Sequence, residues 1–277
     1  MNSFTLADQR QSTALVLGAT GGLGKAYCHA LAKQRLHLII CGRNEEALRT
    51  LSNELVATYN IEVQTHIADL GFEANVERVI ALLSSDERIT WFVNATGLAQ
   101  WGQYNEFSEA SEQAMFQINL LVPIRLVRCA VEAFERRGGG QVVQVASAAA
   151  FFTVPFLSGY CASKTAIVQW LRAIRQENCA PSIHIQALCP GFVKTDMFAK
   201  AGANAERLPH WIWMSPERIV RESLHAVELN RTICIPGRRY RMMIFGLKWV
   251  PSSISMFVAG RMFGNFSKYR VLASRFS

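Results

Sequence analysis

Tyr160 and Lys164 are the two side chains of this 277-residue sequence whose types and spacing most clearly suggest chemistry. In a helix, residues four apart lie one turn above each other on the same face, so a phenol and an ammonium would share one small volume. Residues 165–171 are compatible with a helix, and Ser158 suits its start. The pattern predicts a helix that presents both groups on one face.

Such a pair would be useful because a free tyrosine titrates near pH ~10, too high for ready proton exchange at neutral pH. A positive charge about 4 Å away stabilises a phenolate by roughly 4 kcal/mol at an effective dielectric constant of about 20, and burial opposes this effect. We therefore expect Lys164 to lower the pKa of Tyr160 and make it an acid/base catalyst near neutral pH. Taken alone, the pair has a second interpretation, an aromatic ring packed under a solvated lysine stem.

Two neighbouring features favour the catalytic interpretation. Ser147 lies thirteen residues before Tyr160, at the end of an apolar segment. Near the N-terminus, the apolar segment 13–17 runs into a glycine-rich turn that begins at Gly18. Glycines there let the backbone approach a pyrophosphate, while the following helix points its N-terminus at the negative charge. In this order the motifs resemble the classical type of the short-chain dehydrogenase/reductase family, over roughly residues 12–240.

That resemblance implies a mechanism and four catalytic residues. Tyr160 would exchange a proton with the carbonyl oxygen of the substrate, and Ser147 would hydrogen-bond that oxygen as charge develops. Lys164 would lower the proton affinity of the tyrosine and hold the ribose of a cofactor. Asn119 matches the asparagine with which the family holds a water beside the lysine, and an asparagine inside a helix is otherwise a poor helix former.

The resemblance also implies a dinucleotide site. Two positions depart from the family pattern, because Leu17 stands where the family usually has threonine and Ala95 where it has a second asparagine. Asp69 matches an aspartate that contacts the adenine in the family, and capping of a helix expected over 72–84 is its alternative role. The expected cofactor contacts are Gly18, Thr20, Gly22, Leu23, Gly24, Arg43, Asp69, Leu70, Asn94, Ala95, Gly97, Tyr160, Lys164, Pro190, Gly191, Val193 and Thr195.

Arg43 bears on the choice between NAD and NADP. The second expected strand, residues 36–41, ends without the acid that commonly holds the ribose hydroxyls of NAD. Arg43 would instead pair with a 2′-phosphate, which favours NADP(H) over NAD(H) as the cofactor. Its alternative role is that of a solvated residue at the head of a helix expected over 45–59.

Seven segments with strand character alternate with helical ones, which predicts an α/β fold with a doubly wound parallel sheet, the Rossmann fold. Residues 1–237 are expected to form one nucleotide-binding and catalytic domain, and residues 238–277 a basic, apolar C-terminal extension. Residues 108–136 are expected to form two helical stretches, with Asn119 near the end of the first and Pro123 opening the second. The strands are expected at residues 13–17, 36–41, 62–67, 89–93, 141–146, 183–188 and 232–235.

Composition narrows the class of protein. Half of the residues are hydrophobic, enough for a full core, and the length favours one large domain. The seven cysteines are scattered and odd in number, with no Cys-x-x-Cys pair. This pattern argues against a disulfide framework and against a metal site, and it fits a reducing compartment. The first ten residues show no basic segment followed by an apolar stretch, so no secretory signal is expected and a cytoplasmic location is favoured.

The net charge of +8 is concentrated at the C-terminal end. Nine basic residues and no acid lie between Arg231 and Ser277, which leaves 20 basic and 21 acidic side chains in residues 1–230. Lys248 and Pro251 interrupt the apolar stretch too early for a membrane-spanning helix of about 20 residues. Two interpretations stay open, peripheral contact with an anionic membrane surface and packing over the substrate pocket or a subunit partner. Nucleic acid is the least favoured partner, because apolar residues interleave with the cations and no binding motif is present.

Together these features predict an NADP(H)-dependent oxidoreductase that interconverts a carbonyl and a secondary alcohol on a hydrophobic small molecule, such as a steroid, a ketoacyl thioester or another lipid ketone. The hydrophobic substrate is expected because residues 196–214, where the family places its substrate lid, are rich in Trp, Met and Phe. The rival functions are a non-redox epimerase or dehydratase on the same fold and a catalytically silent NADP-sensing protein. The family commonly pairs through helices near 108–136 and 158–178, which implies a homodimer or homotetramer.

Overall fold

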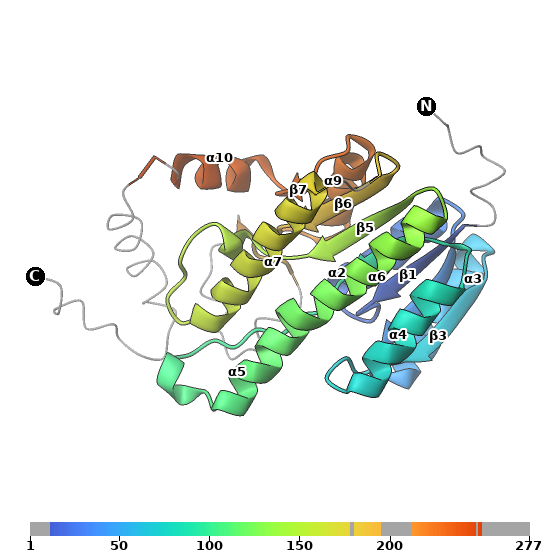
Figure 1. The fold of residues 1–277 in the computed structure, drawn as a ribbon, viewed down its shortest axis with the longest axis horizontal. Coiled ribbons are helices and arrows are strands. Elements are labelled where there is room, and N and C mark those ends of the chain that lie inside the picture. Colours follow the sequence, from blue (N-terminus) through green and yellow to red (C-terminus); the bar gives the residue numbers. More distant parts are fainter. Residues whose placement is uncertain (1–11, 178–179, 195–211, 248, 251–277) are drawn as a thin grey trace, which may run out of the picture.

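The computed structural model describes residues 12–177, 180–194, 212–247 and 249–250. Within them, seven strands form one sheet in the order β3-β2-β1-β4-β5-β6-β7, and every neighbouring pair is parallel (Figure 1). The predicted doubly wound parallel sheet is therefore confirmed. The strands are β1 (Thr13–Leu17), β2 (His37–Gly42), β3 (Val63–Ile67), β4 (Ile89–Asn94), β5 (Gly140–Val145), β6 (Ile183–Leu188) and β7 (Ile233–Cys234).

Helices cover both faces of the sheet (Figure 1). In β1, the side chains of Ala14 and Val16 belong to the core on one face, and those of Leu15 and Leu17 to the core on the other. Both faces are buried, so β1 is a continuous apolar run rather than an alternating one. One face is covered by α2 (Gly22–Lys33), α3 (Glu45–Tyr59) and α9 (Pro216–Glu228), the other by α4 (Glu73–Ser85), α6 (Val122–Arg136) and α7 (Ser158–Gln176).

The centre of the sheet is a topological switch point. β1 and β4 are neighbours, and from them the chain proceeds outward in opposite directions, to β2 on one side and to β5 on the other. Gly18 follows β1 and Ala95 follows β4, and the Ala95 N–H donates to the Leu17 carbonyl at 3.0 Å. In open parallel sheets, ligands bind in the crevice outside the carboxyl ends of the strands at such a point.

The residues predicted as two helical stretches over 108–136 form one continuous helical run. α5 (Glu109–Phe116) passes through a π-helical turn, Gln117–Leu121, directly into α6. Pro123 lies in the first turn of α6, as expected. Asn119 is inside the π-helical turn instead of near the end of a separate helix.

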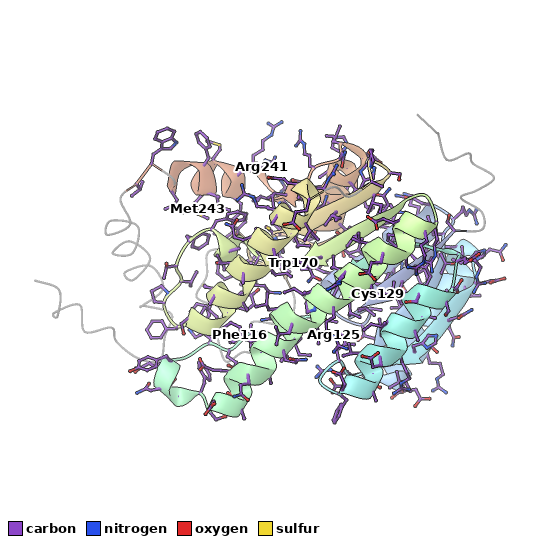
Figure 2. All side chains as sticks on the ribbon, viewed as in Figure 1. Phe116, Arg125, Cys129, Trp170, Arg241 and Met243 are labelled. Carbon is purple, nitrogen blue, oxygen red and sulfur yellow. The ribbon has the colours of Figure 1, made fainter. Side chains whose placement is uncertain are left out.

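By length and composition alone, the run Glu109–Arg136 is the one helix among the described residues that would suffice to cross a membrane. The packing of this run shows that it covers the sheet of a globular domain. Phe134 is fully buried in the core beneath the sheet, and Arg125 forms ion pairs with Glu73 at 2.8 Å and Glu77 at 2.5 Å on α4 (Figure 2). The run is therefore a core helix of this fold.

The described chain ends with α10 (Arg238–Leu247), which lies at the β7 edge of the molecule, apart from the helices that cover the sheet (Figure 1). α10 begins where the C-terminal extension was expected to begin. Lys248 and residues 251–277 of that extension lie outside the described residues, as do Thr195 and residues 196–211 of the expected lid.

Candidate active site

Ser147 and Tyr160 come together at the carboxyl end of β5. Ser147 caps a short 3₁₀ turn, Ala148–Ala150, and its hydroxyl accepts a hydrogen bond from the Ala149 N–H at 3.1 Å. Tyr160 lies in the first turn of α7 and is only 5% exposed. A hydrogen bond joins the side chains of Ser147 and Tyr160. The two hydroxyls predicted to face a substrate oxygen are therefore in contact.

The charge state of Tyr160 differs from the expectation. Burial raises the pKa of the phenol to about 12, and the hydrogen bond with Ser147 offsets only part of this rise. The Lys164 Nζ lies 5.7 Å from the centroid of the Tyr160 ring. The expectation that the pKa of Tyr160 is lowered is wrong, because desolvation by burial is the largest effect on the phenol and raises its pKa. Tyr160 is a protonated group, suited to donating a proton.

Lys164 is buried one turn further along α7. Its side chain is 2% exposed, and its Nζ donates to the Val145 carbonyl at 3.3 Å. Burial lowers the pKa of the ammonium to about 8. An ammonium has three N–H donors, so beyond the bond to Val145 it retains capacity to bind hydroxyl groups such as those of a ribose.

Asn119 is fully buried in the π-helical turn. Its Oδ1 accepts from the Leu98 N–H at 2.9 Å, and its Nδ2 donates to the Leu98 carbonyl at 2.8 Å and to Ser163 Oγ at 3.2 Å. Ser163 Oγ donates in turn to the Tyr160 carbonyl at 2.8 Å. The amide thus joins the loop after β4 to the first turn of α7. Its role in holding a water stays a prediction, while π-helical turns do frequently mark functional sites.

We expect Asn119→Ala to lower the free energy of unfolding by about 2–3 kcal/mol, because buried partners on Leu98 and Ser163 lose their hydrogen bonds. Urea unfolding of the variant and the wild-type protein measures the change. Asn53→Ala, on the exposed side of α3, is the matched control and should stay within about 0.5 kcal/mol. An Asn119→Ala variant as stable as the wild type would contradict the structural role of this side chain and leave only its predicted catalytic role.

The glycine-rich turn after β1 forms a cradle for a ligand. Gly18 has a φ of +71°, and a Cβ there would lie 3.0 Å from the Ala95 backbone. A Cβ on Gly24 would lie 2.1 Å from the Gly18 carbonyl oxygen, so both positions require glycine. α2 begins here with Gly21 as N-cap, with neither a side-chain cap nor an acid in its first turn. Its N-terminal N–H groups therefore suit an anion such as a pyrophosphate.

The other residues predicted to contact a cofactor from this half of the chain lie at the same edge of the sheet. Thr20, Gly22 and Leu23 belong to the turn and the start of α2, and Gly97 follows β4. The prediction required these residues to lie at this edge of the sheet, and they do. Their contacts with the cofactor stay predictions.

Asp69 follows β3, where it forms a local turn. Its Oδ1 accepts from the Gly71 N–H at 3.0 Å. It does not cap α4, whose N-cap is Phe72 without a side-chain hydrogen bond, so the alternative role of Asp69 as a helix cap is wrong. Leu70 beside it is buried in the core. The contact of these two residues with an adenine stays a prediction.

Arg43 stands between the end of β2 and the start of α3, beside a cavity of about 680 Å³. Thr20 of the glycine-rich turn reaches the same cavity, so the space adjoins the cradle at Gly18. Arg43 is the cation of this lining, and Glu45 and Glu46 contribute two acids to it. The lining residues are Thr20, Arg43, Asn44, Glu45, Glu46 and Ala47.

A buried amide pair, Asn94 and Gln144, links the loop after β4 to Lys164. Asn94 Nδ2 donates to Gln144 Oε1 at 2.9 Å, and Asn94 Oδ1 accepts from the Thr96 N–H at 3.1 Å. Gln144 Nε2 donates at 3.0 Å to the Val145 carbonyl, which also accepts from Lys164. Both amides are fully buried, so they hold the two strand ends in one network. Sequence reasoning missed Gln144; its signal was an amide within an apolar strand.

The segment after β6 reaches the same edge of the sheet. The Pro190 carbonyl accepts from the Ala148 N–H at 2.8 Å, which fixes this segment beside the turn that carries Ser147. Val193 pairs with Met214 in an isolated parallel bridge. The predicted Pro190 and Val193 are thus near the catalytic candidates, while the predicted Thr195 lies outside the described residues.

Tyr240 of α10 packs onto this segment and was not singled out from the sequence. A Cβ on Gly191 would lie 2.0 Å from its ring, so glycine leaves the space that the ring fills. The Tyr240 hydroxyl accepts from the Phe192 N–H at 3.0 Å and donates to the Ile212 carbonyl at 2.6 Å. One phenol therefore joins α10 to both ends of the connection between residues 192 and 212.

Apolar side chains surround Tyr160 and form a cluster of their own, distinct from the two cores of the sheet. Phe192 belongs to it and meets the ring of Trp213 edge to face, with centroids 5.7 Å apart. A carbonyl beside Tyr160 would therefore lie in apolar surroundings. The cluster contains Met115, Ala149, Val154, Leu157, Tyr160 and Cys161, packed against Leu98, Ala99, Trp101, Phe152 and Phe192.

Comparison with known proteins decides the family. The family model described as short chain dehydrogenase matches residues 12–206. The chain belongs to the short-chain dehydrogenase/reductase family. The ketoacyl reductase HetN from a Nostoc species is 30% identical to this family member over 202 residues, which cover 71% of this chain and 69% of HetN.

Two further relatives of this short-chain dehydrogenase/reductase differ in what they show. The human inactive hydroxysteroid dehydrogenase-like protein 1 is 28% identical over 222 residues, 79% of this chain, and the match spans 66% of the human protein's length. A short-chain dehydrogenase from Sphingobium yanoikuyae in complex with NADPH superposes with a TM-score of 0.78 over 94% of this chain and 97% of that one. Its identity of 24% makes this a likeness of fold.

The residues present fit the nicotinamide dinucleotide that this oxidoreductase family uses. The cradle at Gly18 and the uncapped start of α2 suit the pyrophosphate, and Lys164 has donors for a ribose. The choice between NAD and NADP depends on Arg43 and is treated below.

Proposed function

We propose that this short-chain dehydrogenase/reductase is an NADP(H)-dependent oxidoreductase that interconverts a carbonyl and a secondary alcohol on a hydrophobic small molecule. The observation that carries the proposal is the contact between Ser147 and a protonated, buried Tyr160, with Lys164 one turn further along α7. Such a pair of hydroxyls can hydrogen-bond one substrate oxygen from two sides.

When bound, the nicotinamide supplies or accepts the hydride. Tyr160 gives its proton to the carbonyl oxygen, and Ser147 donates a hydrogen bond to the same oxygen as negative charge develops on it. Lys164, held by the Val145 carbonyl, places its positive charge behind Tyr160 and stabilises the phenolate that remains. Asn119 holds the first turn of α7 in place through Ser163.

The apolar cluster around Tyr160 supports a hydrophobic substrate. Carbonyl-bearing substrates with apolar bodies gain from burial of that surface, at about 25 cal/mol for each Å² removed from water. The names of the relatives point the same way, because one is a ketoacyl reductase and another is named for hydroxysteroids. We therefore propose a lipid-like ketone or alcohol, either a ketoacyl or a steroid-like compound.

The human relative is named as inactive, which raises the alternative of a catalytically silent protein that only binds NADP. In this chain Ser147, Tyr160, Lys164 and Asn119 are all present, and the contact of Tyr160 with Ser147, the distance of 5.7 Å between its ring centroid and the Lys164 Nζ and the link from Asn119 through Ser163 support a catalytic role. This arrangement favours turnover over sensing alone.

The test is a panel containing a ketoacyl thioester, a ketosteroid and a small polar ketone, assayed by loss of NADPH absorbance. We expect turnover with at least one apolar ketone and a lower kcat/KM with the polar one. Binding of NADPH without turnover of any substrate would favour the silent protein. Conversion of a substrate without net NADPH loss would favour an epimerase or dehydratase.

We propose NADP(H) over NAD(H) because Arg43 is the cation of the cavity beside Thr20, at the ribose end of the site. Arg43→Asp is expected to raise the KM for NADPH by about 10- to 100-fold, the loss of one charge-assisted hydrogen bond of about 1.5–3 kcal/mol. The KM for NADH should fall or stay the same. Arg49→Asp, on the exposed side of α3, is the control of equal charge change. An unchanged preference in Arg43→Asp would contradict the assignment.

The assembly and the location are proposals as well. We propose a homodimer or homotetramer through the outer sides of α5, α6 and α7, where Leu121 is 50% exposed and Figure 2 marks Phe116 and Trp170. A monomeric mass in light scattering would overturn this.

The six free cysteines of the described residues support a reducing, cytoplasmic location.

A further inference from the structure

We propose that α10 docks the protein on an anionic lipid surface, through its outward apolar side chains and an arginine-lined cavity at its base. This surface lies apart from the candidate catalytic residues, and the docking does not depend on the proposed reaction. The proposal selects one of the two interpretations that the composition of the C-terminal extension leaves open.

One side of α10 is held by the protein and the opposite side is not covered by the described residues. Ile244 is 4% exposed, and Tyr240 anchors the helix to the segment after β6. Met242 is 74% exposed, Phe245 is 64% exposed, and Trp249, just after the helix, is 78% exposed. Aromatic and methionine side chains on the outer side of a short, anchored helix are the arrangement of an interfacial helix.

At the base of α10, a cavity of about 750 Å³ opens between α9, β7 and α10. Among the described residues that line it, Glu222 is the one carboxylate; it is engaged by Arg218 and Arg241, each at 3.2 Å, and accepts from the Gly237 N–H at 2.8 Å (Figure 2 labels Arg241). The cavity therefore carries a surplus of guanidinium groups, which bind phosphate oxygens in a fork geometry. Its arginines are Arg218, Arg231, Arg238, Arg239 and Arg241.

The arginines of the cavity and the exposed apolar side chains of α10 together indicate which kind of partner binds this surface. A soluble phosphate compound would use the cavity and would leave Phe245 and Trp249 without a role. A second copy related by two-fold symmetry would bring the same arginine-rich patch against itself, which like charges oppose. An anionic phospholipid satisfies both features, because its phosphate meets the arginines while its acyl region takes the apolar side chains.

Docking at α10 has a consequence for the site. Tyr240 bonds to the Phe192 N–H, and Phe192 belongs to the apolar cluster around Tyr160. The helix that would meet the membrane is therefore joined to the apolar cluster through Tyr240 and the backbone of Phe192. A link between docking and the reaction through this contact, unlike the docking itself, rests on the proposed function.

The test is co-sedimentation of the full chain with vesicles at low salt, without substrate. We expect binding to phosphatidylglycerol/phosphatidylcholine vesicles and none to phosphatidylcholine alone. Phe245→Ser should weaken binding about tenfold through lost apolar burial, and Arg238→Ser about fivefold through one lost cation near the surface. Phe72→Ser, at a residue 66% exposed before α4, and Arg49→Ser on α3 are the matched controls and should bind as the wild type does.

Two results would overturn the docking. The wild type could stay in the supernatant with both kinds of vesicle, or Phe245→Ser and Arg238→Ser could both bind as the wild type does. Turnover of a soluble ketone by Phe245→Ser, measured in parallel, separates failure of the docking from failure of the proposed function.

Discussion

Tyr160→Phe is expected to lower kcat for ketone reduction by about 10³-fold, within the range that a positioned general acid contributes. The variant keeps the buried ring and loses only the hydroxyl that bonds to Ser147. Cofactor affinity should change little, because the cradle at Gly18 and the donors of Lys164 are untouched. Steady-state kinetics gives kcat, and quenching of protein fluorescence by NADPH gives the dissociation constant.

Tyr104→Phe is the matched control, since this tyrosine is 76% exposed and is not a member of the apolar cluster around Tyr160. It should leave both kcat and cofactor affinity unchanged. A Tyr160→Phe variant that retains the wild-type kcat would show that Tyr160 is not the general acid. Loss of cofactor binding in that variant would instead assign the hydroxyl to cofactor binding, since Tyr160 is also one of the expected cofactor contacts.

Lys164→Met is expected to change activity and stability in opposite directions. The ammonium behind Tyr160 is lost, so kcat should fall at least about 10²-fold. The free energy of unfolding at pH 7 should rise by up to about 3 kcal/mol, because the wild type buries a charge whose pKa drops from 10.5 to about 8 on folding. Methionine is apolar and of similar length, and the Val145 carbonyl keeps its bond from Gln144.

The sign of the pH dependence follows from the lowered pKa. Between pH 8 and 10.5 the unfolded chain holds the lysine proton and the folded protein does not, so wild-type stability rises with pH across this window. The advantage of Lys164→Met should therefore be largest below pH 8 and disappear toward pH 10.5. The reductive activity of the wild type should decline as pH rises through about 8, where the ammonium loses its proton. Thermal or urea unfolding across this range measures the difference, and a variant less stable than the wild type at pH 7 would contradict it.

The strands and the placement of the catalytic candidates were predictable because local signals determine them. β1 is a short, mostly apolar run that is followed by a glycine, and β5 is a short, valine-rich run that also contains Gln141 and Gln144. Both have the length and burial of central parallel strands. Once β5 precedes α7 in a doubly wound sheet, Ser147 at the strand end and Tyr160 in the first helical turn must lie at the same edge.

The properties that escaped prediction depend on groups distant in sequence. The raised pKa of Tyr160 is a sum of desolvation from many packed neighbours, which the spacing to Lys164 does not report. Asn119 finds its partners at Leu98 and Ser163, and only the folded chain brings these together. Tyr240 reaches the segment after β6 because α10 turns back onto it, and a tyrosine in a basic, apolar stretch carries no signal of that contact.

The most direct test of the account is the fate of a labelled hydrogen in one reduction. The full chain is incubated with an apolar ketone and NADPH carrying deuterium at the nicotinamide carbon that gives up the hydride, and the alcohol is analysed by mass spectrometry. The account predicts one deuterium on the carbinol carbon of the product and a hydroxyl proton from solvent, with the label transferred far more slowly in Tyr160→Phe. An alcohol without deuterium, or transfer at the same rate in Tyr160→Phe, would contradict it.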